Sequence, residues 1–194
     1  MGFIQSKNEY SLFIQRRNSL ICVVVVYVED IILTRTDIDA MQELKAALHI
    51  LLSIKDLGKL SYFLGIEVGY SDAGILLSQK KFKRELIHDC NIPLKNRAVT
   101  PLPLGLKLQQ EPGEPLLDAE VYRSHVGKLN FLIYTSRPDL SFVVQSLSQF
   151  MHHPYTSHLQ ALIHTLSYVA QTEVQGILLS ALPKLYLHAF SDSD

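Results

Sequence analysis

The feature that most constrains this chain is an apolar, largely β-branched run that two adjacent carboxylates interrupt. Residues 20–27 read Leu-Ile-Cys-Val-Val-Val-Val-Tyr, which is typical of a β-strand covered on both faces. Val28, Glu29 and Asp30 break the run, and Ile31–Thr34 resumes it. A strand, a short polar turn and a second strand predict an antiparallel hairpin. Because an unpaired carboxylate is costly to bury, we expect both acids at or beside the turn.

The surrounding pattern predicts an α+β fold. A β-prone segment at Tyr10–Gln15 precedes the hairpin, and a helix that Asp37 can cap follows it. This helix has one apolar stripe, made of Ile38, Met41, Leu44, Leu48 and Leu51. A second hairpin is expected from strands at Ser61–Tyr70 and Ile75–Ser78, with Ser71–Gly74 as its turn.

The second half of the chain is mainly helical in pattern. Ser78 can cap a helix whose basic residues are expected to point outward, namely Lys80, Lys81, Lys83 and Arg84. After loops rich in Pro and Gly, three more helices are expected to start at Asp118, Pro138 and Ser157. Ser157 and Gln160 have the spacing of a capping box. We expect these three helices to pack through their apolar stripes, largely separate from the N-terminal sheet.

Charge and composition exclude several classes of protein. The formal net charge is −1, so nucleic acid would have to be bound through a local basic patch. Cys22 and Cys90 lie far apart, which suits a reduced protein and predicts neither a zinc site nor a disulfide. The longest apolar run, Leu20–Val28, is about half the length of a membrane helix, and no signal peptide follows Met1. We therefore expect an intracellular protein, cytoplasmic or nuclear, that is neither secreted nor in a membrane.

Two neighbouring acids on a hairpin turn have a plausible chemistry. Their charges repel each other, which raises the cost of ionising both unless a cation lies between them. Oxygen-only ligands suit magnesium, and magnesium ions held by carboxylates are the machinery of nucleotidyl transfer. Glu29 and Asp30 are therefore candidate metal ligands. The alternative is a common acidic turn whose side chains simply point into water.

Several segments, taken in order, resemble copia-type retrotransposon polyproteins. Tyr-Val-Glu-Asp at residues 27–30 resembles the Tyr-x-Asp-Asp hairpin of reverse transcriptases. Residues 54–68 look like the segment that joins the palm of these polymerases to the thumb. Further motifs of the same family lie at residues 77–82, 122–132, 135–144 and 147–154. The final His-Ala-Phe-Ser-Asp-Ser-Asp is similar to the first strand of the ribonuclease H domain that follows in the same polyprotein.

The resemblance implies a domain for each part of the chain. These are a partial polymerase palm at residues 1–77, a helical thumb and connection at 78–175, and the first strands of a truncated ribonuclease H-like domain at 176–194. Strand patterns at Gly176–Leu179 and Leu185–Phe190 fit the last of these. Asp192 matches the first catalytic acid of the ribonuclease H domain.

The parent family performs RNA-directed DNA synthesis with Mg2+, on a template–primer duplex and with dNTP as substrate. Its site uses the two hairpin acids and a further Asp from an earlier palm strand, which would lie upstream of Met1, as would the fingers. The resemblance thus implies a chain cut at both ends. Glu29 replaces the first hairpin Asp, and Arg35 stands where the family usually has Gly.

From these departures we expect a catalytically inactive fragment of an RNA-directed DNA polymerase. Mg2+ is the cofactor of the parent family, and whether this chain retains it is left open. The missing polyprotein segments would be its partners in trans. The alternative is a non-catalytic remnant that binds nucleic acid or another protein.

Nucleic-acid contacts are expected from two places in the chain. The basic helix residues Lys80, Lys81, Lys83 and Arg84 would contact phosphates, and Tyr27 would lie beside the acids and contact a base or sugar. The alternatives are a solvated helix face and an aromatic of the core. His152, His153 and His158 match no zinc spacing and are expected in a loop before a helix.

Overall fold

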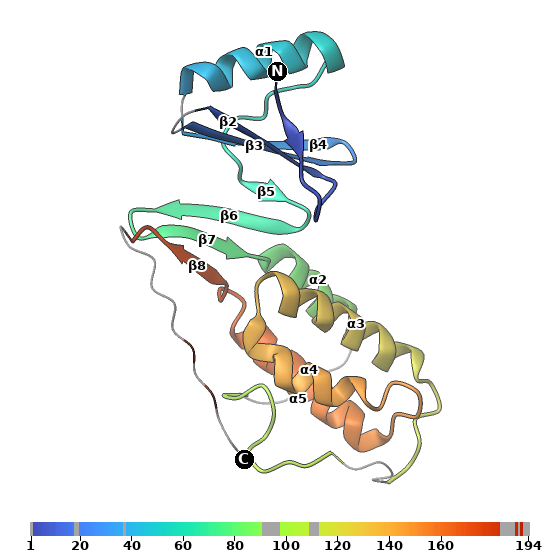
Figure 1. Cartoon of the computed structure of the whole chain (residues 1–194). Helices are drawn as coiled ribbons and strands as arrows, with labels where there is room; N and C mark the ends of the chain where they lie inside the picture. The colour runs from blue at the N-terminus through green and yellow to red at the C-terminus, as the bar shows by residue number, and fades with distance from the viewer. Residues whose placement is uncertain are drawn as a thin grey trace. The chain divides into compact units, whose positions relative to one another are not determined.

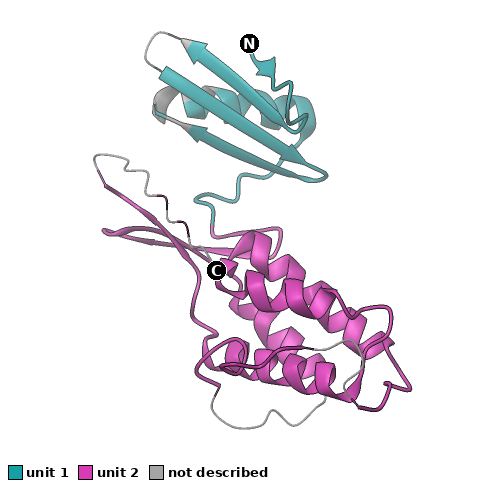
Figure 2. Cartoon of the chain, turned by 60° about the horizontal axis from the view of Figure 1, so that its bottom comes forward, with its two compact units in different colours: residues 1–60 teal, residues 61–194 magenta. Residues whose placement is uncertain are grey.

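The computed structural model describes residues 2–17, 20–36, 38–90, 98–108, 113–182, 189 and 191. The chain divides into two compact units, Met1–Leu60 and Ser61–Asp194 (Figure 2). Each unit has its own sheet and its own cluster of buried apolar residues. The second hairpin therefore lies in the same unit as the C-terminal helices, whereas the sequence grouped it with the first hairpin.

The first unit is a four-stranded antiparallel sheet with a helix on one face (Figure 1). In spatial order the strands are β1 (Ile4–Gln5), β2 (Leu12–Arg17), β3 (Leu20–Tyr27) and β4 (Asp30–Arg35), and α1 (Ile38–Leu52) follows them. The expected hairpin is confirmed, since β3 and β4 pair along their length. Leu44 of α1 packs in the core with Cys22 and Val24 of β3.

Strand β3 is covered on one face only by elements of its own unit. Side chains alternate between the two faces of a strand, and Cys22 and Val24 are on the face of the α1 core. On the other face, Ile21 remains 42% exposed and Tyr27 remains 49% exposed. The prediction of a strand buried on both faces is therefore wrong. The β-branched run is explained by the preference of such residues for extended backbone.

The second unit contains a sheet in which four strands lie in chain order. These are β5 (Tyr62–Phe63), β6 (Ile66–Ser71), β7 (Gly74–Ser78) and β8 (Ile177–Ser180), all antiparallel. The stretch expected to be one strand up to Tyr70 is broken by a turn at Leu64 and Gly65, where φ is 49° and 83°. Only glycine adopts such angles freely, so Gly65 was the missed turn signal. The next turn is shorter than expected and contains only Asp72 and Ala73.

Strand β8 returns from the last helix, and the strand predicted at Gly176–Leu179 is confirmed. Its pairing with β7 was not predicted. Two glycines permit the close approach of these strands. A Cβ atom on Gly74 would lie 2.1 Å from the Leu179 carbonyl oxygen, and one on Gly176 would lie 2.2 Å from the Leu77 carbonyl oxygen. Any other residue at either position would require the backbone to shift.

The helices of the second unit form its core. They are α2 (Lys80–Asp89), α3 (Glu120–Thr135), the short 3-10 helix η1 (Pro138–Leu140), α4 (Ser141–Ser148) and α5 (Thr156–Gln171). Their buried apolar residues are Leu86, Tyr122, Val126, Leu129, Leu132, Leu140, Val143, Val144, Leu147, Ala161, Leu162, Leu166 and Val169. The predicted packing of these helices through their apolar stripes is confirmed, and among the described residues every member of this cluster belongs to the second unit.

Two helix starts can be compared with the predictions. The helix expected from Asp118 begins at Glu120, and the Asp118 Oδ1 atom accepts a hydrogen bond from the Glu120 backbone N–H at 2.8 Å. Ser78 does not cap α2, and that prediction is wrong. Instead, the Glu67 carboxylate on β6 accepts a hydrogen bond from the Lys81 backbone N–H at 2.8 Å. An acid contributed by the neighbouring strand, which sequence spacing does not reveal, satisfies this helix end.

The start of α5 also differs from the prediction. The capping box uses Tyr155 and His158, since the Tyr155 backbone N–H donates to Nδ1 of His158 at 3.0 Å. Ser157 and Gln160 do not form it, and the Ser157 hydroxyl is buried without a hydrogen-bond partner. His158 is fully buried and its ring stacks on Phe150. We expected His158 in the loop before α5, but it lies within the helix.

Three expectations fall outside the described residues. These concern the helix cap Asp37, the strand at residues 185–190 except Ala189, and the matched acid Asp192. In the part of the chain that the structure describes, no helix is both long enough and apolar enough to cross a membrane.

Candidate active-site hairpin

The two acids lie on a hairpin with a two-residue turn. Tyr27 pairs with Asp30, so Val28 and Glu29 form the turn and Asp30 is the first residue of β4. Val28 has a φ of 49°. A positive φ at the first turn residue is typical of the tight turns that match the twist of paired strands. The prediction that the acids lie at or beside the turn is confirmed, and the ladder behind them fixes their backbone.

The hairpin tip is open to solvent. Glu29 and Asp30 are exposed, and so is Val28, at 86%. Because residues of paired strands that face each other share a side of the sheet, Asp30 and Tyr27 lie on the face opposite α1. The tip thus presents the ring of Tyr27 and the carboxylates of Glu29 and Asp30. Val28 lies between the ring and the acids in the chain.

The described residues do not complete a metal centre around this tip. Nowhere in the described ranges do three His, Cys, Asp or Glu side chains come close enough together to hold a metal ion. A two-ion polymerase centre needs more ligands than the two neighbouring carboxylates offer. The residues therefore do not fit such a centre by themselves. His152 and His153 lie in bends before α5, as expected.

Val28 carries a conformational cost that can be measured. A β-branched residue in the left-handed region is strained, and Asn tolerates that region well. We expect Val28→Asn to raise the free energy of unfolding of the first unit by about 1 kcal/mol, because the exposed valine loses little burial. Urea denaturation measures the change. Val99→Asn is the control, since Val99 is 83% exposed without a positive φ, and an equal gain there would rule out backbone strain as the cause.

The basic helix α2 differs from the prediction at its centre. Lys83 is only 1% exposed, and its Nζ atom donates a hydrogen bond to the Gln175 carbonyl at 2.7 Å. The expectation that Lys83 points outward is therefore wrong. Gln79, four residues before it, and Leu86, three residues after it, are buried on the same helix face. Burial, and then the positive charge of Arg137, lower the pKa of Lys83 to about 8.

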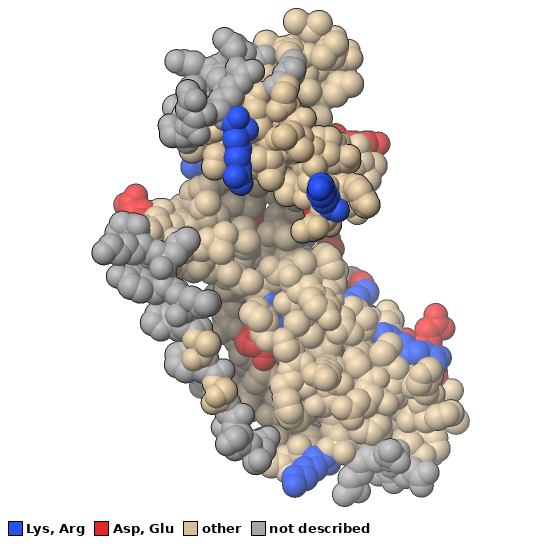
Figure 3. Space-filling view, viewed as in Figure 1, with Lys and Arg blue, Asp and Glu red and all other residues tan. Residues whose placement is uncertain are grey.

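The other basic residues of α2 are at the surface or partly buried. The Arg84 Nε atom lies 2.5 Å from the Glu173 carboxylate, and Lys81 lies 4.0 Å from Glu85 one turn later. Lys80 is half-buried. On the face drawn in Figure 3, the described lysine and arginine side chains lie apart from one another and form no continuous basic band. Phosphate binding by Lys80, Lys81 and Arg84 stays a prediction.

Arg137 is an important residue that we did not single out from the sequence. It is 1% exposed, and its Nε and Nη2 atoms donate to the two oxygens of Asp139 at 2.9 and 2.8 Å. Its Nη1 atom donates to the Thr172 carbonyl at 3.2 Å, and its guanidinium lies 5.3 Å from the ring centre of Tyr168. The available signal was the Thr-Ser-Arg-Pro-Asp segment, in which the two charged partners stand two residues apart.

Gln79 joins two of the segments that carry the family resemblance. It is fully buried, and its Oε1 atom accepts hydrogen bonds from the hydroxyls of Thr135 and Ser136. The motif at residues 77–82 therefore meets the motif at residues 135–144 inside the second unit. These contacts explain Gln79, Thr135 and Ser136 as residues that hold the interior together.

Comparisons with known proteins bear on the hairpin directly. The model of a family described as reverse transcriptase (RNA-dependent DNA polymerase) matches residues 1–103. The retrovirus-related Pol polyproteins from transposons RE1 and RE2 of Arabidopsis thaliana are 40% and 39% identical to this chain over all 194 residues. The chain spans 13% of the length of each polyprotein.

A shorter relative is similar to most of the chain. An uncharacterized mitochondrial protein of Arabidopsis thaliana is 35% identical over 170 residues, which are 88% of this chain and 70% of that protein. No solved structure gives a significant match.

Proposed function

The chain belongs to the reverse transcriptase (RNA-dependent DNA polymerase) family, as its resemblance to copia-type polyproteins predicted, and we propose that it carries the acid hairpin of a polymerase site. The observation that supports this proposal is the β3–β4 hairpin itself. Within the matched residues 1–103, it holds Glu29 and Asp30 at the end of a rigid two-stranded ladder. Fixed carboxylates of this kind are what divalent-metal chemistry on nucleotides requires.

In the context of a whole polyprotein, the partners of this segment would be a template–primer duplex and dNTP. Asp30 is the retained family acid, Glu29 occupies the position of the other, and Tyr27 is placed to contact the substrate. Phosphate contacts would come from Lys80, Lys81 and Arg84, with Lys83 excluded by its burial. A divalent metal is the cofactor that the family implies, and completing its site would require carboxylates beyond those of the hairpin.

The domain assignment also remains a proposal. We propose a palm segment that ends near the division between the two units, followed by a thumb and connection. The pairing of β8 with β7 favours assigning Ile177–Ser180 to this connection. A ribonuclease H-like start would then lie beyond β8 and would include Asp192.

The 194-residue chain alone is expected to extend no primer on an RNA template, with either magnesium or manganese. Two hairpin carboxylates without a third acid do not hold the two ions that the reaction uses. For the same reason, Glu29→Asp should leave the isolated chain inactive. Single-nucleotide extension of a labelled primer is the assay. Extension that disappears in Asp30→Asn would contradict the expectation, whereas extension that persists in that variant would identify a contaminating polymerase.

A non-catalytic binding role is the second candidate, and the open face of the first sheet favours it. Ile4 is 75% exposed, Ile21 is 42% exposed and Tyr27 is 49% exposed. Exposed apolar surface of this kind often marks an interaction site. Titration of a primer–template duplex into the chain, at low and high salt and with and without magnesium, distinguishes the two functions. Binding that depends on salt and not on magnesium would favour a nucleic-acid-binding role, whereas no binding of the duplex would leave the apolar face as a surface for another protein.

A further inference from the structure

The two edges of the first sheet are strands of very different length. In spatial order the sheet runs from β1 to β4, so these two strands are its edges. β1 has two residues, whereas β4 has six, Asp30–Arg35. A very short edge strand is one way in which proteins keep a sheet from pairing with another chain. β4 lacks the other protections, because it contains no proline, glycine or lysine and its charged residues stand only at its two ends.

The outward main-chain groups of β4 belong to alternate residues. Directly after this strand, the Thr36 N–H donates to the Ile21 carbonyl of β3 at 3.4 Å, so even-numbered residues of β4 bond to β3. The N–H and C=O groups of Ile31, Leu33 and Arg35 therefore point away from β3. Among the described residues, the structure gives the outward groups of Ile31 and Leu33 no hydrogen-bond partner.

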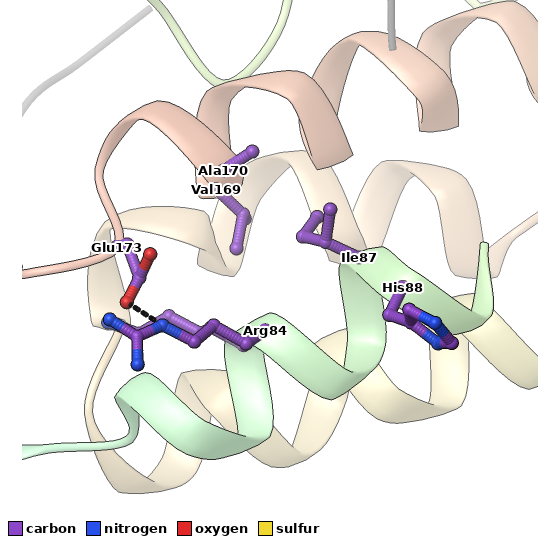
Figure 4. Close-up of a pocket in the computed structure, with 7 residues that line it drawn as sticks. Arg84, Ile87, His88, Val169, Ala170 and Glu173 are labelled. Atoms are coloured by element: carbon purple, nitrogen blue, oxygen red, sulfur yellow. Dashed lines mark ion pairs between the residues drawn. The ribbon is translucent and has the colours of Figure 1, made fainter. Parts of the chain in front are cut away.

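This edge also leaves part of a core open. Charged groups in the second unit meet partners within the chain, as Arg84 and Glu173 do at 2.5 Å beside the groove between α2 and α5 (Figure 4). The main-chain groups of β4 have only water, and the side chains of Ile31 and Leu33 are only partly buried against the core of the first unit. A further strand at this edge would satisfy the main chain and cover both side chains.

We propose that β4 pairs with β4 of a second copy of this chain, antiparallel and centred on Leu33. Leu33 then faces Leu33 of the second copy and Ile31 faces position 35, so residues with outward main-chain groups meet each other. Each such pair exchanges two hydrogen bonds, which gives about six in all. Ile32 faces Thr34 on the side of the sheet away from α1. The two four-stranded sheets become one sheet of eight strands, which is within the usual size of a sheet.

The acids of the hairpin favour this antiparallel arrangement. Glu29 and Asp30 stand at one end of β4, so parallel pairing would place the acids of both copies side by side. In the register centred on Leu33, Asp30 faces Thr36 of the second copy, and the two Asp30 residues are about 20 Å apart along the strands. Their repulsion is screened at that distance, because the Debye length is about 8 Å at physiological salt. The same separation keeps the two hairpins from sharing a metal, so the proposal does not depend on polymerase function.

Sedimentation velocity of the whole chain, from about 1 to about 100 μM, tests the proposal. The weight-average mass should rise with concentration from 22.0 kDa toward twice that value. Ile32→Lys places a charge in the middle of the edge strand and should raise the dissociation constant about tenfold or more. Ile21→Lys makes the same change on the same side of the sheet, but on the inner strand β3, and should not weaken association. Circular dichroism verifies that each variant is folded.

A cysteine cross-link tests the register and does not depend on the lysine variants. Leu33→Cys places two thiols directly opposite each other, with about 5.5 Å between the Cα atoms, a distance that a disulfide spans. Mild oxidation should therefore give a covalent dimer. Thr34→Cys should not, because the two copies of residue 34 lie diagonally, about 7–8 Å apart. Cys22 and Cys90 are buried and should add no cross-link.

Three results would overturn pairing through β4. A mass that stays at 22.0 kDa over the whole concentration range would show that the edge is left to water or to a strand of another protein. Equal weakening by Ile32→Lys and Ile21→Lys would show that the copies meet through the sheet face and not through its edge. Cross-linking of Thr34→Cys as readily as of Leu33→Cys would contradict the register.

Discussion

Grafted into an intact copia-type reverse transcriptase, this segment should extend primers on the order of a hundredfold more slowly than the same graft carrying Glu29→Asp. The added methylene moves the Glu29 carboxylate by about 1.5 Å relative to that of an Asp. The hairpin leaves little freedom to compensate, because the paired Tyr27 and Asp30 close the turn directly on either side. Magnesium in turn tolerates little departure from octahedral geometry.

The loss should fall on turnover and leave affinity for the duplex nearly unchanged, because in our proposal the duplex is bound through basic contacts elsewhere. Single-nucleotide extension on an RNA template, with the duplex affinity measured separately, distinguishes the two effects. Asp30→Asn in the graft should abolish extension. Glu9→Asp, the same shortening at an exposed position of the first unit, should change nothing. Equal rates with Glu29 and with Glu29→Asp would show that the site tolerates the longer side chain.

The hairpin could be predicted from the sequence because its signal is local. A β-branched run interrupted by a short polar segment fits few structures other than a hairpin. The predicted bounds of both strands agree with those of β3 and β4 to within one residue. The break at Leu64 and Gly65 is equally local but was missed, because the apolar residues on either side read as one continuous strand. A single glycine within a strand pattern is a turn signal, and a prediction based on hydrophobic periodicity alone misses it.

The polar interior of the second unit could not be predicted from the sequence in the same way. Lys83 stands among Lys80, Lys81 and Arg84, and charge alone assigns all four to a solvated face. The structure buries Lys83 because the carbonyl that accepts its hydrogen bond comes from Gln175, 92 residues later. Such a partner is set by tertiary packing, which a pattern within one helix does not contain.

The contact network of Arg137 leads to a large expected effect on stability. We expect Arg137→Ala to lower the free energy of unfolding of the second unit by about 3 kcal/mol, since removing the buried Arg137 side chain opens a cavity and leaves the Thr172 carbonyl and Asp139 without their donor. Arg84→Ala removes the same side chain from a pair in which Arg84 is 70% exposed and should cost less than about 1 kcal/mol. Urea denaturation followed by circular dichroism gives both values, and amide hydrogen exchange assigns them to the second unit.

The pH dependence of the same variant separates the role of the charge from simple loss of packing. Burial alone raises the pKa of Asp139, but the hydrogen bonds and charge of Arg137, together with the hydrogen bond from Tyr168 and one from the backbone, outweigh burial and lower the pKa below its usual value. In the natural chain, the stabilisation by Asp139 is therefore present above a pH of about 4 and is lost as the pH falls through the lowered folded pKa. In Arg137→Ala the contribution of the arginine is lost, so the folded pKa of Asp139 should rise and the stability that Asp139 contributes above a pH of about 4 should shrink. The variant should therefore lose less stability than the natural chain as the pH falls below about 4. An unchanged slope in the variant would show that Arg137 acts through packing alone.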